Sequence, residues 1–155
     1  MLSAPQPKTK PDHFAITFAP LSLDEAYRLA DDGRNGAIVV MSGMVRDNTD
    51  GQAVESLEYQ AYEPMALEVF KQIAEQIRQQ WAEVTHVVMH HRTGRLTVGE
   101  ISVLVVVGCP HRSEAFAACK YAIDTLKHNA PIWKKEHWAD GSSSWVSIGA
   151  CEEEE

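Results

Sequence analysis

The pattern of apolar and polar residues predicts a chain in which strands alternate with helices. Five segments between residues 14 and 109 are rich in β-branched residues or alternate between apolar and polar positions, which is typical of strands. They are residues 14–21, 36–46, 54–62, 85–94 and 100–109. The last is apolar almost throughout, which predicts a central position in its sheet. Turn-forming residues at 47–52 predict a hairpin between the second and third strands.

Helix signals separate these strands. Ser22 is placed to cap a helix over residues 22–33, with Glu25 completing a capping box and Gly33 just past the end. Pro64 opens a second helix. Its apolar residues recur at four-residue spacing, which predicts a stripe facing the core, at Val69, Ile73, Ile77 and Trp81.

A third helix and a final pair of strands complete the chain. The helix is expected from Ser113 to about Lys127, because Ser113 can cap its start and Pro131 stops the backbone soon after its end. Residues 132–138 and 144–148 flank a turn rich in glycine and serine, which predicts a terminal hairpin. The order β-α-β-β-α-β-β-α-β-β predicts an α+β fold, with helices packed on a mostly antiparallel or mixed sheet.

Length and composition fit one globular domain. The chain has 155 residues, of which 45% are hydrophobic and 23% charged, and this is enough for a core of its own. We expect that single domain over residues 14–150. A flexible N-terminal arm is expected over residues 1–13 and a solvated acidic tail over residues 151–155.

Charge and cysteine content argue against several classes of function. The formal net charge of -8 argues against nucleic-acid binding, which normally uses a broad basic face. The sequence has no apolar run long enough for a membrane span or a secretory signal. Its three cysteines are odd in number and form no CxxC pair. They predict neither a disulfide framework nor a zinc site, and they favour a reducing cytoplasm.

Cationic side chains gather in residues 111–137 of this acidic chain. His111 and Arg112 stand at the expected start of the third helix, where unpaired backbone N–H groups favour an anion. Lys127 ends that helix, and Lys134 follows the turn after it. The segment therefore predicts a site for a small phosphate or carboxylate ligand. On these residues alone, an Arg112 that only pairs with a surface acid stays an open alternative.

The remaining reactive side chains are weaker candidates. Cys109 and Cys119 are expected at an apolar strand end and in mid-helix, where a thiol is usually a small hydrophobic group. His90 and His91 are neighbours on a strand and point to opposite faces, so that one is expected in the core and one exposed. Cys109 and His111 form a C-x-H pair without two further ligands at metal-site spacing, so no metal is predicted.

Five blocks of sequence together resemble one family. They are GMVRD at 43–47, SLEYQAYEPMA at 56–66, HRTGRLTVGE at 91–100, PHRSEAF at 110–116 and AIDTLKHNAPIWKKE at 122–136. In this order and spacing they resemble the large, catalytic subunit of molybdopterin synthase, over residues 14–148. The resemblance implies an α/β hammerhead-like fold with three main helices and an added antiparallel β subdomain.

The resemblance implies a sulfurtransferase of molybdenum cofactor biosynthesis. That family converts cyclic pyranopterin monophosphate (precursor Z) into molybdopterin by installing the two sulfurs of a dithiolene. The sulfur arrives as a thiocarboxylate on the C-terminal Gly-Gly of a small ubiquitin-like subunit, so the resemblance implies no further cofactor. The implied assembly is a heterotetramer with a homodimer of large subunits at its centre.

The resemblance also implies a set of site residues, carried over motif by motif. Lys127 and Lys134 match the family's catalytic lysines. Substrate binding is implied for both lysines and for Met44, Val45, Arg46, His111, Arg112, Lys135 and Glu136. Because this chain has GMVR where bacterial relatives often have GKVR, only the backbone of Met44 is expected to line the pocket.

Two other functions fit parts of this pattern. A non-catalytic binder of a phosphorylated ligand would keep His111 and Arg112 but has no need of Lys127 beside Lys134. A purely structural subunit of an oligomer needs none of the four. The lysine pair therefore favours the sulfurtransferase, and we expect Lys127 and Lys134 to face each other across the turn at Pro131.

Overall fold

A computed structural model of the protein describes residues 10–148, apart from the side chain of Ser147. The strands are β1 (His13–Thr17), β2 (Ala37–Met44), β3 (Asn48–Thr49), β4 (Gln52–Ala61), β5 (His86–Arg92), β6 (Gly94–Thr97), β7 (Ile101–Cys109), β8 (Ile132–Trp138) and β9 (Ser143–Ser147). The helices are α1 (Leu23–Leu29), α2 (Glu63–Gln80) and α3 (Arg112–Asn129).

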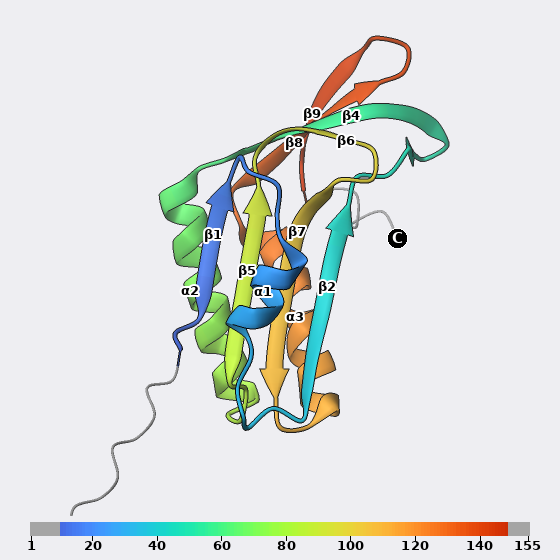
Figure 1. Cartoon of the computed structure of the whole chain (residues 1–155). Coiled ribbons are helices and arrows are strands. Elements are labelled where there is room, and N and C mark those ends of the chain that lie inside the picture. Colours follow the sequence, from blue (N-terminus) through green and yellow to red (C-terminus); the bar gives the residue numbers. More distant parts are fainter. Residues whose placement is uncertain (1–9, 149–155) are drawn as a thin grey trace, which may run out of the picture.

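The strands form two sheets, and the second sheet lies at one end of the first (Figure 1). The first has the order β1-β5-β7-β2, and it is mixed because β1 runs parallel to β5 while the other pairs are antiparallel. The second is antiparallel, with the order β3-β4-β8-β9 and with β6 paired to β4. The predicted α+β class is therefore confirmed.

The central strand β7 is buried on both faces. Val103, Val105 and Val107 belong to the main core, which α2 and α3 cover. Leu104 and Val106, which alternate with them, belong to a smaller core under α1. Since successive side chains of a strand point to opposite faces, two covered faces require an apolar residue at every position. The predicted central place of this segment is confirmed.

The helices begin and end close to their predicted positions. Ser22 caps α1, because its hydroxyl accepts a hydrogen bond from the Glu25 N–H at 3.1 Å. In α2 the predicted stripe is buried at Ile73 and Ile77 but only partly buried at Val69 and Trp81. The core-facing side of α2 also carries Phe70, which sequence spacing had not singled out.

The start of α3 differs slightly from the prediction. His111 is the N-cap and the helix begins at Arg112, one residue before Ser113. Small buried residues let α3 lie close to the first sheet, and the Cys119 sulfur is 3.7 Å from the Val105 carbonyl oxygen. Burial raises the pKa of the Cys119 thiol to about 11, so this cysteine is a packing residue.

One predicted strand pairing is wrong. The turn at 47–52 does make a hairpin, with Asp50 and Gly51 at positive φ, but it joins β3 to β4. The strand β2 pairs with β7 in the other sheet. Two short strands, β3 and β6, were also absent from the predicted order, because two and four residues are too few for a periodic pattern.

The N-terminal end of the described chain is bound to the fold. The Asp12 carboxylate accepts hydrogen bonds from Arg78 at 2.5 and 2.8 Å and from the Val87 N–H at 2.9 Å, and β1 starts at His13. The rest of the expected arm, residues 1–9, and the acidic tail, residues 151–155, lie outside the described residues. Within the described range, no helix is long and apolar enough to cross a bilayer.

A close backbone approach links the loop before β2 to the start of α3. A Cβ atom on Gly36 would lie 2.1 Å from the carbonyl oxygen of Pro110, which immediately precedes the N-cap of α3. We expect Gly36→Ala to lower the free energy of unfolding by about 2 kcal/mol, because backbone must move to admit the methyl group. Gly33→Ala is the matched control, since its Cβ would meet nothing within 4 Å. Equal urea midpoints for the two variants would contradict the expectation.

Candidate active site

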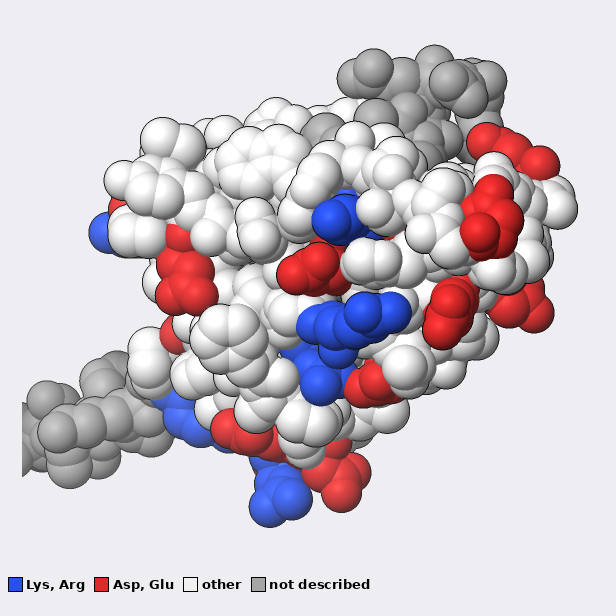
Figure 2. Space-filling view, turned by 90° about the horizontal axis from the view of Figure 1, so that it is seen from above, with Lys and Arg blue, Asp and Glu red and all other residues white. Residues whose placement is uncertain are grey.

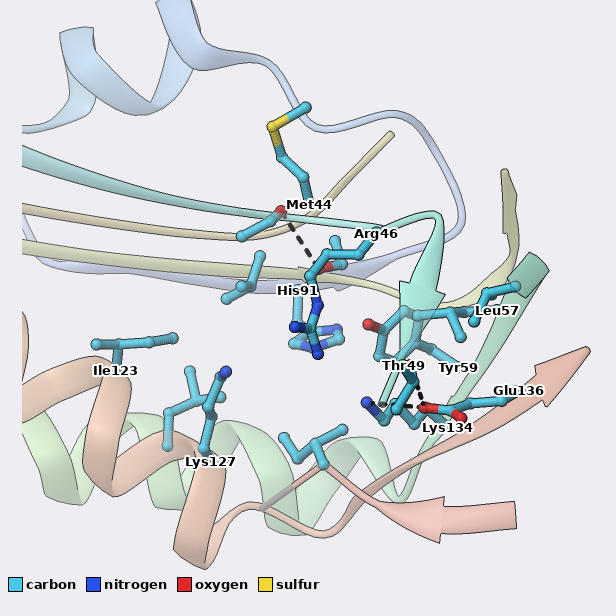
Figure 3. A pocket seen from close by; sticks show the side chains of 16 residues that line it. Met44, Arg46, Thr49, Leu57, Tyr59, His91, Ile123, Lys127, Lys134 and Glu136 are labelled. Carbon is cyan, nitrogen blue, oxygen red and sulfur yellow. Dashed lines mark hydrogen bonds and ion pairs between the residues drawn. The ribbon is translucent and has the colours of Figure 1, made fainter. Parts of the chain in front are cut away.

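A pocket opens where one end of the first sheet meets the second sheet and the end of α3 (Figure 3). Gly43 and Val103 line it from the first sheet, Leu57 from the second, and Ile123 and Leu126 from α3. Its empty space, with the solvent-filled mouth included, is about 690 Å³. A concave site with apolar walls and a few polar side chains is typical of small-molecule binding.

The segment 44–46 contributes one charged side chain to the pocket. The Met44 side chain extends away from the cavity and is 56% exposed, so Met44 borders the pocket through its backbone (Figure 3). Val45 is buried in the core and is absent from the pocket wall. Arg46 lines the pocket and directs its guanidinium group into it (Figure 3).

A turn beside Val45 holds this segment in place. The Val45 N–H donates to the Glu100 carbonyl oxygen at 3.0 Å, and Gly99 N–H donates to the Val45 carbonyl oxygen at 2.9 Å. The Glu100 carboxylate accepts hydrogen bonds from the Thr97 N–H and hydroxyl and pairs with Arg92. These contacts lower the pKa of Glu100 to about 2, so the turn is fixed by an ionised carboxylate.

Lys127 and Lys134 reach the pocket from two different elements. Lys127 lies in the last turn of α3, and Lys134 lies on β8, after the turn at Pro131. Both line the pocket, and Figure 3 shows them on opposite sides of it with the Arg46 guanidinium between them in the view. The structure thus brings three of the candidate residues to one cavity.

Glu136 holds Lys134 in position. The two side chains lie on the same face of β8, with the Lys134 Nζ 3.3 Å from the Glu136 Oε1, and only 13% and 4% of them are exposed. Thr49 donates a longer hydrogen bond to the same oxygen, at 3.5 Å. A buried carboxylate needs such partners, so the Glu136 side chain is tied to Lys134 and Thr49.

Lys135 points away from the pocket. It lies between Lys134 and Glu136 on β8 and therefore faces the other side of the strand. Its Nζ stands 5.6 Å from the centre of the Trp145 ring, on the neighbouring β9. Lys135 was predicted to bind substrate, but within one chain it is not part of the pocket wall.

His111 and Arg112 lie at the other end of the molecule from these lysines. They border a shallow hollow with Gly36, at the start of α3. From Arg112 to Lys127 the helix rises about 22 Å at 1.5 Å per residue. The four cations are close in sequence, within residues 111–137, but within one chain the structure separates His111 and Arg112 from the two lysines.

His91 lines the pocket and was missed as a site residue. The prediction that His90 and His91 point to opposite faces is confirmed, because His90 contacts His13 while His91 packs on Tyr59 in the pocket wall. The expectation that one of the pair is exposed is wrong, since His90 is 6% and His91 3% exposed. No local signal could have found His91, because Tyr59, on which it packs, and Lys127, which lines the same pocket, are distant from it in sequence.

The described lining of the pocket contains no thiol. Cys109 and Cys119 are buried and unpaired, and neither borders the cavity. Across the described residues there is also no group of three or more side chains suited to hold a metal ion. The chemistry open to this pocket is therefore that of cations, one carboxylate, hydroxyl groups and an imidazole.

Charge is distributed unevenly over this end of the molecule. Figure 2 looks down on the end that carries the second sheet, where lysine and arginine side chains gather near the centre and acidic side chains surround them. In a chain of net charge -8, such a local group of cations attracts and orients a small anion.

The fold and the cationic pocket together define an α+β subunit with a site suited to an anionic ligand. The family model described as MoaE protein matches residues 16–129. The chain belongs to this family, that of the molybdopterin synthase catalytic subunits. It is thus an enzyme subunit of molybdopterin biosynthesis.

Known relatives agree in both sequence and structure. The chain is 77% identical over 142 residues to a molybdopterin synthase catalytic subunit of Nostoc sp., covering 92% of this chain and 86% of that protein. A crystal structure of molybdopterin synthase from Staphylococcus aureus matches with a TM-score of 0.80 and 39% identity, over 84% of this chain and 94% of that one.

A further solved structure shows a complex. It contains subunits 1 and 2 of the molybdopterin-converting factor from Helicobacter pylori. One of its chains matches with a TM-score of 0.71 and 26% identity, over 86% of this chain and 89% of that one.

The pairing of Lys134 with Glu136 generates a stability prediction. Lys134→Ala leaves a buried carboxylate without its cation, so the free energy of unfolding should fall by about 3 kcal/mol. Lys135→Ala is the matched control on the same strand and should cost less than about 1 kcal/mol, because it loses only a contact with Trp145. Adding Glu136→Gln to Lys134→Ala should recover part of the loss. Urea unfolding measures all three, and equal losses for the two lysine variants would exclude the pairing.

Proposed function

We propose that this chain transfers sulfur from the C-terminal thiocarboxylate of a small ubiquitin-like subunit to cyclic pyranopterin monophosphate. Two such transfers produce the dithiolene of molybdopterin. The observation that carries the proposal is a pocket with three cationic side chains, Arg46, Lys127 and Lys134, and no thiol in its described lining. The cations suit a phosphorylated pterin, and the sulfur has to come from another molecule.

Each transfer replaces a carbon–oxygen bond of the pterin by a carbon–sulfur bond and breaks the acyl carbon–sulfur bond of the partner. The thiocarboxylate sulfur attacks an oxygen-bearing pterin carbon, the C–S bond forms, and the C–O bond at that carbon breaks, so that the oxygen leaves as water or as the freed end of the phosphate ester. The sulfur is then a bridge between the pterin and the partner's acyl carbon. Water then attacks that acyl carbon, the acyl C–S bond breaks, and the partner leaves as a carboxylate while the sulfur stays on the pterin. The acyl carbon passes through a tetrahedral oxyanion, which a cation in the pocket stabilises.

The two lysines take different parts in this reaction. Lys127 stabilises the oxyanion and exchanges protons with the reacting groups. Lys134, held by Glu136, has a fixed position and orients the pterin together with Arg46.

The sulfur donor is a separate subunit whose tail enters the pocket. A C-terminal Gly-Gly suits this entry, because glycine passes where larger side chains meet the wall. The complex of two subunits in the Helicobacter pylori relative supports such an assembly for this chain. The buried, unpaired Cys109 and Cys119 support a reducing compartment, and we propose the cytoplasm.

The large subunits form a homodimer that completes the site. His111 and Arg112 resemble the family's substrate-binding residues, yet about 22 Å of α3 separates Arg112 from Lys127 in the same chain. A substrate phosphate held by both groups therefore needs His111 and Arg112 from a second copy. Two such dimerised chains, each with a small subunit, make the heterotetramer.

Lys127 provides the test of the chemistry. Lys127→Ala should cut dithiolene formation by about a hundredfold or more, the scale for loss of an oxyanion or proton-transfer group. Lys120→Ala is the matched control, because Lys120 lies on the same helix in an exposed pair with Asp124 and should leave the rate unchanged. The assay mixes each variant with thiocarboxylated partner and cyclic pyranopterin monophosphate and quantifies the dithiolene product. A folded Lys127→Ala chain that works at close to the parent rate would exclude the assigned role.

Mixed dimers test the shared site. Lys127→Ala and Arg112→Ala chains should each be nearly inactive alone. After unfolding and refolding together at equal amounts, half of the dimers contain one of each, and each such dimer has one complete site, so about a quarter of the parent activity should return. No recovery in dimers that mass spectrometry shows to be mixed would mean that both residues act within one chain, and an Arg112→Ala chain that is fully active alone would mean that Arg112 is not part of the site.

A further inference from the structure

His91 is a buried histidine in the pocket wall, and it has no role in the reaction proposed above. It follows His90 on β5, and its ring lies edge-on to Tyr59 with the ring centres 5.0 Å apart. Only 3% of the residue is exposed, and the exposed part belongs to the cavity that Lys127 and Lys134 also line. The ring is therefore enclosed by protein except towards the ligand.

The hydrogen bonds of the ring determine which nitrogen carries a proton. The Nδ1 atom lies 2.8 Å from the backbone carbonyl oxygen of Arg92. A carbonyl oxygen only accepts hydrogen bonds, so Nδ1 must donate. In a neutral imidazole the other nitrogen, Nε2, then has a free lone pair and is an acceptor.

The ring is neutral at physiological pH. Burial lowers the pKa of His91 to about 4, and the positive charge of Lys127 adds to this effect. The other charged residues that border the cavity are Arg46, Lys134 and Glu136, and the last of these is already paired with Lys134. A group that releases its proton near pH 4 is a poor base at pH 7, but it is a hydrogen-bond acceptor with a fixed direction.

The other ring nitrogen, Nε2, is left for a ligand. His91 is one of the residues that line the pocket, and the residue is otherwise buried. Because Nδ1 is bound to the backbone of Arg92, Nε2 is the ring nitrogen that can meet a ligand in the cavity.

We propose that His91 is a substrate-binding residue whose Nε2 accepts a hydrogen bond from an uncharged N–H or O–H group of the substrate. The cations of the pocket, Arg46 and the two lysines, only donate hydrogen bonds and so bind the anionic part. Glu136 is committed to Lys134 and Thr49. His91 supplies the complementary acceptor, which an uncharged donor of the ligand, such as a ring N–H group of a heterocycle, can satisfy.

This proposal rests on the proposed function for the identity of the substrate, a phosphorylated pterin. The competing explanation is that His91 only packs on Tyr59 and bonds to the Arg92 backbone. Two substitutions separate the alternatives. His91→Asn places an amide nitrogen near the position of Nδ1, so it can keep the bond to Arg92 while it removes the acceptor. His91→Gln reaches farther and can place its amide oxygen near the position of Nε2.

The experiment measures binding and turnover in these variants. Calorimetry with cyclic pyranopterin monophosphate gives the affinity, and the complex with thiocarboxylated partner gives kcat and KM. We expect His91→Asn to weaken binding and raise KM about tenfold with little change in kcat, the effect of one lost hydrogen bond. His91→Gln should stay within about threefold of the parent. His90→Asn, on the opposite face of the same strand, is the matched control and should leave both constants unchanged.

A spectroscopic measurement tests the same atom without turnover. In protein labelled with ¹⁵N-histidine, His91 should show the Nδ1-protonated neutral form at pH 7, and adding the pterin should shift the Nε2 resonance. An Nε2-protonated ring, or an Nε2 resonance that the pterin leaves unchanged, would overturn the proposal.

The binding and kinetic measurements also distinguish failure of the His91 proposal from failure of the proposed function. Parent-like binding by folded His91→Asn would overturn the proposal, and so would an equal loss in His91→Asn and His91→Gln, which would mean that the ring itself is required. In both cases the parent chain still forms dithiolene, and the proposed function stands. A parent chain that neither binds nor converts the pterin would overturn the proposed function and this inference with it.

Discussion

Burial of β7 on both faces is the constraint on which the rest of the structure depends. Its alternate residues belong to two different cores, so a shift of one position would exchange the residues under α1 with those under α2 and α3. Because the register of β7 is fixed, the positions of the pocket wall at its start and of α3 after its end are fixed as well. Residues 102 and 103, near its start, form part of the pocket wall, and Cys109, at its end, leads directly to α3.

The path of α3 follows from this constraint. The helix begins where β7 ends and returns along the sheet, so that its last turn arrives at the end of the sheet where β7 began (Figure 1). Lys127 is thereby delivered to the pocket, while Arg112 stays at the far end. The length of one helix thus explains both why Lys127 lies in the site and why Arg112 does not lie in the same one.

The second sheet turns this meeting point into an enclosed site. β4 and β8 pair in a register that sets Tyr59 opposite Lys134 and Leu57 opposite Glu136, so apolar and charged side chains alternate around the cavity. Glu136 is buried and ionic, which is costly unless its partners are in place. The same enclosure removes water from His91 and keeps its imidazole neutral beside the cations. The second sheet therefore provides a positioned cation, Lys134, and encloses an uncharged acceptor, His91, that the first sheet provides.

The sequence by itself determined the elements and the types of side chain available. Capping at Ser22, the apolar run of β7 and the proline after α3 are local signals, and each reports how one segment is buried or where it ends. The family motifs added the identity of the cations. Only the tertiary structure decided which of these side chains share a cavity. It brings Lys127, Lys134 and Arg46 together and adds His91 to the same pocket. It also turns Lys135 away from the pocket and leaves His111 at the other end of α3. Periodicity within a segment describes burial of that segment alone, whereas a site is assembled from segments that meet only when both sheets and α3 have packed.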